Sequence, residues 1–335
     1  MDHPMTDRTP VVPPAPVGPA PRWLSLAALS GATATVCISA IGACAWIRTG
    51  HVSGSVVGSM AQNLEAQVWQ PWFFAFVAVL WVLQWRYPAR SKERQFGQAL
   101  VQDLAWYLLT PVIAVSVISA YMAVLGSGLP AVFGHYTADL VPRLGVWKVA
   151  ALAFVVSDLL NWVAHLVHHK VPTLWQFHAV HHSQREMTVL SDNRTHVIET
   201  MITSTIVFVP AWFLGLSTTQ AATLALLTIY VSAFIHTNIK TNLGLLRYVF
   251  VSPQAHRVHH SLAPEHHDTN YGTVFSWWDY LFGTRWVDDR VYPPTGITDP
   301  AFPMGAHAGP VDAARTWGRQ LAYPFAVLTG AAAYR

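Results

Sequence analysis

The sequence predicts an all-α, polytopic membrane protein with about four transmembrane helices, a hairpin of two further short membrane helices, and a cytoplasmic helical cap holding a histidine cluster. Hydrophobic residues make up 53% of the 335 residues and charged residues only 11%, whereas soluble domains carry about 25% charged residues. Several apolar runs approach the roughly 20 residues that cross a bilayer. Thirteen of the 17 histidines fall between His165 and His267.

The apolar runs set the expected order of membrane segments. A proline-rich stretch, residues 1–22, precedes them and is expected to be a disordered tail. The hairpin is the pair of apolar runs separated by G-L-S-T-T at 215–219. Its two helices either cross the membrane as short spans or form a re-entrant hairpin. The four spans and then the two hairpin helices are Trp23–Ile47, Val68–Gln84, Leu104–Leu125, Val146–Ala164, Ile198–Leu214 and Ala221–Ile235.

The loops predict the orientation of these segments. The densest basic loop is W-R-Y-P-A-R-S-K-E-R at 85–94, which the positive-inside rule places in the cytoplasm. Alternation then puts 126–145 outside and returns the chain to the cytoplasm after His165. Both ends of the hairpin emerge on one face, so every patterned histidine is expected on the cytoplasmic side.

The chain is expected to form one domain with no second globular core, and its sequence is expected to fall into four regions. Residues 1–22 are the tail, 23–100 the first membrane pair with its basic loop, 101–290 the catalytic domain, and 291–335 a C-terminal tail whose apolar patch could lie in the membrane interface. The net charge of +3 gives no case for a nucleic-acid partner. Cys37 and Cys44 share one apolar stretch and are expected to be packing residues.

The histidines form three patterned groups, H-L-V-H-H, H-A-V-H-H and H-R-V-H-H, which begin at His165, His178 and His256. Neutral imidazole is the commonest metal ligand in proteins, and this cluster is larger than one zinc needs. We therefore expect two redox metals and favour iron, although imidazole also suits copper, nickel and zinc. The zincin, nucleophile-elbow, Walker and covalent-haem signatures are absent.

Individual positions differ in how well they fit a metal site. His165 and His169 share a helix face at i, i+4, and in H-x-x-H-H one short segment could reach two metals. His196 and His236 stand at the mouths of the hairpin, whereas His168 lies off the ligand face. Asp158 lies two turns before His165 and could orient an imidazole or make a polar contact between helices.

These residues resemble the fatty acid hydroxylase superfamily, also called the sterol desaturase family. The match is A-H-L-V-H-H-K-V-P-T-L-W-Q-F-H-A-V-H-H-S (164–183), H-T-N (236–238), P-Q-A-H-R-V-H-H-S (253–261), D-T-N-Y-G (268–272) and W-D-Y-L-F-G-T (278–284). Leu166 replaces the arginine that commonly follows the first ligand. The resemblance implies a non-haem di-iron centre that uses O2 and two electrons to attack a lipid C–H bond.

The resemblance also implies the site residues. The ligands would be His165, His169, His178, His181, His182, His256, His259 and His260, joined by His236 and His196 at the hairpin. The residues expected to hold these imidazoles are Asp158, Asn238, Asp268, Asn270 and Asp279. Asp268, Asn270 and Asp279 fit a polar loop capping the cytoplasmic face equally well.

The expected function is hydroxylation or desaturation of a membrane lipid. A sterol, fatty acyl chain, sphingolipid, ether lipid or carotenoid would fit, and the sequence does not choose among them. No fused cytochrome b5 signature is present, so electrons are expected from a separate ferredoxin- or cytochrome b5-type donor with its reductase. The alternative is a metal transporter or sensor with a histidine-rich cytoplasmic region. A zinc-dependent membrane hydrolase is a third hypothesis, but the sequence shows no signature for the general base and open zinc position that it needs.

Overall fold

The computed structural model describes residues 71–331 apart from 92, 94–96, 135–136 and 305–308. Regular structure in this part of the chain is helical, and the only β-type pairings are isolated bridges such as Pro88 with Ile239. The expected all-α class is therefore confirmed. The expected tail at 1–22 and the first apolar run, Trp23–Ile47, lie outside the described residues.

The remaining apolar runs are all helices, but α4 begins six residues before and ends eight residues after the expected run, and α6 ends six residues after its expected run. They are α3 (Pro71–Arg86), α4 (Gln98–Phe133), α6 (Val146–Lys170), α8 (Val197–Phe213) and α9 (Thr218–Ile235). Within the described residues, α6 alone is both long and apolar enough to cross a membrane, and α3, α8 and α9 contribute shorter apolar stretches. An apolar helical bundle is thus shown, with one membrane-capable helix among the described segments.

The hairpin between α8 and α9 is held by local chemistry. Gly215 has a φ of +93°, a conformation that side chains disfavour, and a Cβ there would lie 2.3 Å from the Asp139 carboxylate. Ser217 then caps α9, since its hydroxyl accepts from the Gln220 amide while the Gln220 side chain accepts from the Ser217 amide. The expected break at 215–219 is therefore a tight turn between two helices.

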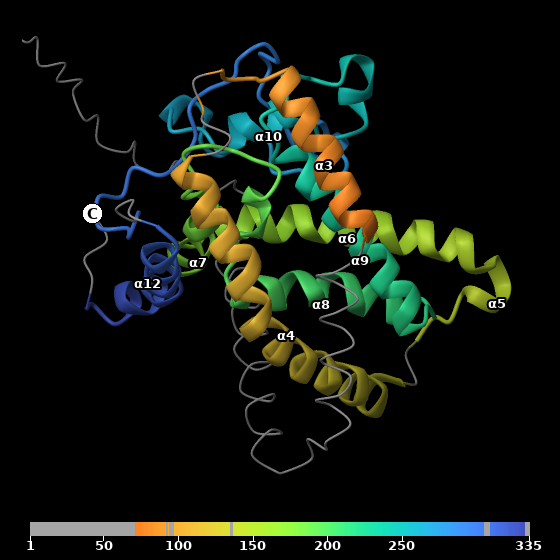
Figure 1. Ribbon diagram of the computed structural model, residues 1–335. Helices are drawn as coiled ribbons and strands as arrows, with labels where there is room; N and C mark the ends of the chain where they lie inside the picture. Colours follow the sequence, from red (N-terminus) through yellow and green to blue (C-terminus); the bar gives the residue numbers. More distant parts are fainter. Residues whose placement is uncertain (1–70, 92, 94–96, 135–136, 305–308, 332–335) are drawn as a thin grey trace, which may run out of the picture.

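The helices pack around α6, which Figure 1 shows running from the short helix α5 (Val141–Leu144) at one end to α7 (Pro172–His182) at the other. Val149 and Ala153 of α6 pack with Val207 and Ala211 of α8 in a buried apolar core. Such burial contributes about 25 cal/mol for each Å² of apolar surface removed from water. This core anchors the helix that carries the first histidines.

The C-terminal region contains α12 (Pro310–Leu328), which lies beside α4 and α7 (Figure 1). The Trp106 indole of α4 donates to Gln320 Oε1 of α12 at 2.8 Å, and Trp106 packs with Val180 of α7, Phe302 and Tyr323. The α12 helix, within the region expected as a tail, thus packs against the histidine-bearing helix α7.

Short elements complete the end of the molecule at which the histidines gather. They are η2 (Ser191–Asn193), η3 (Gly244–Tyr248), α10 (Pro253–His259), η4 (Pro264–His266) and α11 (Trp277–Phe282). Ser252 caps α10 by accepting from the Ala255 amide at 3.1 Å, and Pro253 occupies the first turn, where no amide donor is needed. The third histidine motif is therefore helical from His256 to His259, and His260 is the C-cap residue.

Candidate metal centre

A sharp turn between α6 and α7 brings the first two histidine motifs together. Val171 is extended (φ −102°, ψ 112°) because Pro172, which lacks an amide proton, cannot continue α6 and instead begins α7. The helical spacing places His165 and His169 on one face of α6, and the turn sets that face against α7. The ring centroids of His169 and His178 lie 4.9 Å apart as a result.

Nine histidines form two groups whose ligand atoms lie within 4.8 Å of one another in each group. We call these the five-histidine group and the four-histidine group. The five-histidine group consists of His165, His169, His178, His182 and His259. The four-histidine group consists of His181, His236, His256 and His260. The H-A-V-H-H and H-R-V-H-H motifs are each shared between the groups, so the segments of α7 and α10 each contribute to both.

Ring nitrogens converge in the four-histidine group. His236 Nε2 lies 3.0 Å from His181 Nε2 and 2.8 Å from His256 Nε2, and His256 Nε2 lies 3.0 Å from His260 Nε2. A single hydrogen bond can satisfy one such pair, but it cannot satisfy a set of nitrogens that all face one point. Lone pairs converging on one point are what a metal ion requires.

The five-histidine group shows the same convergence through unpaired nitrogens. The Nε2 atoms of His165, His169 and His259 are buried and have no hydrogen-bond partner among the described residues. His178 Nε2 and His182 Nε2 complete the group, 3.0 Å apart. Buried polar atoms are almost always paired in native structures, so three unpaired nitrogens aimed into one group could together bind a cation.

The protonation of these rings fits metal binding. Burial, reinforced by the neighbouring imidazoles, lowers the pKa of His181, His182, His256 and His260 well below the usual histidine range. Burial likewise lowers the pKa of His259 to about 3. The rings are therefore neutral near pH 7, and a neutral imidazole offers the lone pair that a metal takes.

Backbone carbonyls of one loop orient two rings of the five-histidine group. His165 Nδ1 donates to the Tyr271 carbonyl and His259 Nδ1 donates to the Thr269 carbonyl, each at 2.8 Å. The loop is kinked at Asp268 (φ 62°) and Asn270 (φ 56°), residue types that tolerate left-handed backbone. Donation from Nδ1 leaves Nε2 free to face the group.

Two carboxylates that were not among the predicted site residues lie beside further imidazole rings. Glu199 of α8 accepts from His178 Nδ1 at 2.8 Å. His236 Nδ1 donates to the Ser232 carbonyl at 2.7 Å. The Asp192 carboxylate of η2 lies 3.3 Å from that nitrogen and accepts from the Ser232 hydroxyl at 2.7 Å. A lone carboxylate at the start of an apolar run is a signal that could have identified Glu199, because a charge is costly there unless it has a partner.

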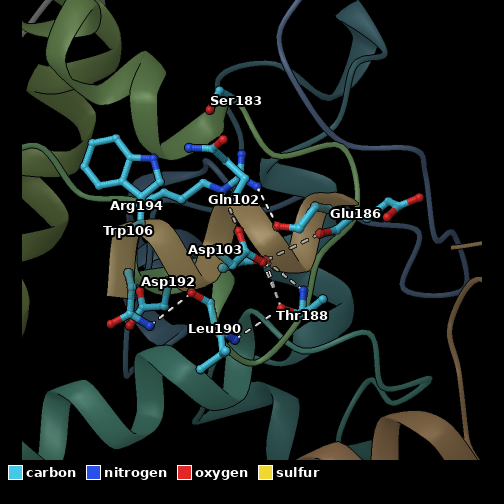
Figure 2. Close-up of polar contacts among 12 residues, drawn as sticks. Gln102, Asp103, Trp106, Ser183, Glu186, Thr188, Leu190, Asp192 and Arg194 are labelled. Carbon is cyan, nitrogen blue, oxygen red and sulfur yellow. Dashed lines mark hydrogen bonds and ion pairs between the residues drawn. The ribbon is translucent and has the colours of Figure 1, made fainter. Parts of the chain in front are cut away.

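A buried polar cluster fixes the loop that carries Asp192 (Figure 2). Asp103 of α4 accepts from the hydroxyls of Thr188 and Ser191, each at 3.0 Å, and pairs with the Arg194 guanidinium. Asp103 and Arg194 are both buried, at 0% and 4% exposure. The cluster therefore holds the connection between α7 and α8 against α4 and, through it, the carboxylate beside His236.

The residues predicted to hold the imidazoles do so only indirectly. Asp158 contacts no ligand ring: it accepts from the Val274 and Phe275 amides and from the Trp278 indole at 2.9–3.0 Å. Of the two roles left open for Asp158, these contacts correspond to a polar contact between segments, and the Tyr271 carbonyl is the group that accepts from His165.

Asp279 accepts from the amides of Tyr271 and Gly272, each at 2.9 Å, and so fixes the carbonyl that holds His165. Asn270 donates to the Ala255 carbonyl at 2.9 Å, which ties the loop to α10.

The other two predicted residues lie in ion-pair networks at the edge of the site. Asp268 pairs with Lys170 at 2.6 Å and accepts from the Tyr271 hydroxyl at 2.9 Å. Asn238 accepts from Arg257 at 3.0 Å. Both therefore brace the backbone around the histidines without contacting a ring.

The structure does not bring His196 into either group. Its Nδ1 accepts from the Ile198 amide at the start of α8, and its Nε2 lies 3.1 Å from the Leu321 carbonyl of α12. His168 is also outside the groups, as its position on α6 predicted, and its Nδ1 donates to the Ala164 carbonyl at 2.7 Å.

Comparison with known proteins gives one matching family. Residues 150–284, which contain all nine grouped histidines, match the family model described as fatty acid hydroxylase. No solved structure matches the chain.

Three relatives illustrate the range of matching proteins. Ornithine lipid hydroxylase OlsE of Rhizobium tropici is 28% identical over 63% of this chain and 65% of its own length. Human alkylglycerol monooxygenase is 32% identical over 44% of this chain and 33% of its own. Human cholesterol 25-hydroxylase is 28% identical over 46% and 56%. The match thus covers less than two thirds of each relative.

Proposed function

From the match of residues 150–284 to the fatty acid hydroxylase family we propose that this chain is a membrane-bound, non-haem di-iron oxygenase that hydroxylates or desaturates an aliphatic C–H of a lipid. The observation that carries the proposal is the pair of converging histidine groups. Each group would hold one iron ion through its Nε2 atoms.

The nitrogen spacing favours ions with octahedral geometry. At a metal–nitrogen distance of about 2.1 Å, neighbouring ligands lie about 3.0 Å apart around an octahedral ion and about 3.4 Å apart around a tetrahedral one. The facing nitrogens here are 2.8–3.0 Å apart. Five ligands also exceed the four of a structural zinc site. The spacing in both groups and the ligand number in the five-histidine group support iron over a structural zinc ion.

Bound iron would supply the O2-dependent oxidation that imidazoles alone cannot perform. The residues of this chain would bind the iron and orient the imidazole rings that bind it. Glu199 and the Tyr271 and Thr269 carbonyls fix the rings of the five-histidine group, while Asp192 and the Ser232 carbonyl fix His236. Packing of α12 over α4 and α7 excludes water from one side.

A lipid substrate fits both the relatives and the helices. The names of the relatives specify ornithine lipid, alkylglycerol and cholesterol, all of which carry hydrocarbon beside a polar group. We propose that the apolar helices lie in the bilayer, with the histidines on the cytoplasmic side. A hydrocarbon chain could then reach the site without exposing its CH2 groups to water, which would cost about 0.8 kcal/mol for each.

The proposed reaction consumes two electrons from outside the chain. We propose a separate ferredoxin- or cytochrome b5-type donor with its reductase, approaching from the aqueous side. The domain division proposed is residues 101–290 for the catalytic unit, with 23–100 as the first membrane pair. The α12 helix supports this unit by packing on α7.

Metal analysis and isotope labelling test the proposal. Protein purified after growth with iron should contain two irons per chain, and lipid mass spectrometry of expressing cells should show a gain of one oxygen or a loss of two hydrogens. Under labelled O2 a hydroxylated product should carry the label. Label arriving from water, or active protein holding only zinc, would overturn the proposal. Iron bound and transported without lipid oxidation would favour the transporter or sensor.

A further inference from the structure

The segment from Tyr271 to Phe282 descends along α6 and returns. Its ring contacts trace the path: Tyr271 lies 6.1 Å from Trp162, Phe275 lies 6.0 Å from Phe154, and Phe282 lies 4.5 Å from Trp162. Phe154 and Trp162 are about 12 Å apart along a helix that rises 1.5 Å per residue. The segment therefore leaves the histidine end, reaches the middle of the membrane-capable helix, and comes back.

The outer surface of this segment and of the adjoining η3 is apolar. Leu245 is 83% exposed and Leu281 is 69% exposed, and the rings of Tyr248 and Tyr280 join the two elements at 5.7 Å. Phe275 stacks on both Phe250 and Trp277 at the end of the segment that lies farthest from the histidines along α6. We call this surface the wedge, and its exposed members are Leu245, Leu246, Tyr248, Phe250, Trp277 and Leu281. An apolar surface of this kind requires a covering partner.

The polar groups inside the wedge have partners within the protein. Asp158 accepts from the Val274 and Phe275 amides, and the Val251 and Ser276 amides donate to the Val274 and Val249 carbonyls at 3.0 Å. Non-helical backbone is tolerated at membrane depth only where its hydrogen bonds are satisfied by protein. The wedge meets that requirement through a carboxylate on α6 itself.

We propose that the wedge inserts into the hydrocarbon layer of the leaflet on the histidine side. The surface is continuous with α6, the membrane-capable helix against which its inner residues pack. Two arginines border the wedge. The guanidinium of Arg247 lies 4.8 Å from the centroid of the Tyr248 ring, and the guanidinium of Arg285 lies 4.5 Å from the centroid of the Tyr280 ring. Aromatic and basic side chains of this kind are favoured where acyl chains meet headgroups.

The insertion would connect lipid contact to the metal centre. The loop that enters the wedge carries the Thr269 and Tyr271 carbonyls, which orient His259 and His165. Lipid packing against the wedge therefore stabilises the outer support of the five-histidine group. The inference rests on the membrane placement within the proposed function, but it does not depend on iron or on catalysis.

Spin-label depth measurements test the insertion. In full-length protein carrying Cys37→Ser and Cys44→Ser, single nitroxides are placed at Leu245→Cys or Leu281→Cys and the protein is reconstituted in phosphatidylcholine vesicles. Collision with O2, which concentrates in lipid, is compared with collision with a water-soluble nickel chelate. Leu152→Cys on the exposed face of α6 is the lipid control, and Glu265→Cys in the polar loop is the aqueous control.

Both wedge labels should match the Leu152 label in their preference for O2. A preference for the nickel chelate equal to that at Glu265 would overturn the proposal. Spin–spin broadening that disappears on dilution with unlabelled protein would also overturn it, since a second copy would then cover the surface.

As a second measurement, Leu281→Asp should shift the label at position 245 toward water, and Val311→Asp on α12, also exposed, should not. Equal shifts for both variants would contradict the insertion. A failure of the iron or oxygen-labelling experiments would leave the depth result standing, so the two proposals can fail separately.

Discussion

The two histidine groups use the same two short helices, but they differ in ligand number and in how their rings are held. In the five-histidine group, three rings donate to fixed acceptors: the Tyr271 carbonyl, the Thr269 carbonyl and Glu199. In the four-histidine group only His236 has such acceptors, while the Nδ1 atoms of His181, His256 and His260 are buried without partners among the described residues. The first group is thus rigidly oriented and the second less so.

This difference indicates unequal roles for the two proposed ions. The five-histidine group would hold its ion through five imidazoles, and the four-histidine group would hold its ion through four. Outer hydrogen bonds fix ring orientation and raise ligand basicity. We therefore expect the five-histidine group to hold its metal more strongly and the four-histidine group to offer more room for exogenous ligands.

The largest expected effect comes from removing a ligand from each group. His236→Ala and His169→Ala should each lower activity by more than about 100-fold, since even outer-shell changes cost 10–100-fold. Iron should fall close to one per chain in His236→Ala, because three ligands remain, and should stay closer to two in His169→Ala. Metal analysis with His267→Ala, an exposed histidine outside both groups, as control checks this. Equal iron loss in both variants would remove the distinction.

A smaller effect is expected from the two carboxylates. Glu199→Gln should weaken iron retention by about 10–100-fold, because Glu199 is the acceptor for His178 Nδ1. Asp192→Asn should fall near the lower end of that range, since the Ser232 carbonyl still accepts from His236 at 2.7 Å. Retention after dialysis against a graded chelator measures both. Stronger iron loss in Asp192→Asn would reverse the proposed order.

The loop whose carbonyls orient two rings of the five-histidine group offers a third test. A Cβ at Gly272 would lie 2.9 Å from Asp279, Phe275 and Val251 atoms, so Gly272→Ala must displace the loop. Overpacking of this kind costs about 1–3 kcal/mol. The thermal midpoint should fall and one iron should bind less strongly, while Gly318→Ala, with open space around it, should behave as wild type. Loss of both irons together would mean that the groups are not independent.

The smallest effect is expected at His168. Its Nδ1 is already paired within α6 and it belongs to neither group, so His168→Gln should keep two irons and lose less than about tenfold in activity. Iron analysis is the decisive measurement. A loss of one iron would make His168 a further ligand, near the His178 ring at a centroid distance of 5.4 Å.

Much of the site could be predicted because its signals are local. Helical spacing placed His165 and His169 on one face, and the nine grouped histidines were all among the predicted ligands. His196 was included because it stands at a hairpin mouth, but its ring instead caps α8 and meets α12. Position along the chain could not show which way that ring turns.

The outer partners could not be predicted in the same way because they come from distant segments. Tyr271 lies 106 residues from His165 and supplies a backbone carbonyl, which every residue type has and no motif marks. Asp158 was recognised as a buried acid, but its partners are the amides of Val274 and Phe275. Its role depends on the packing of the 271–282 segment along α6, which only the tertiary structure shows.

The sequence by itself determined the helical class, the apolar runs, the histidines from which the two groups are drawn and the family resemblance, because these depend on composition and on short-range periodicity. Only the tertiary structure decided how the histidines divide into five and four, which carbonyls and carboxylates hold them, and where the wedge lies. Those features depend on the turn at Val171 and on the packing of α7, α10 and the 268–282 loop against α6. Contacts between segments far apart in the chain leave no periodic trace in the sequence.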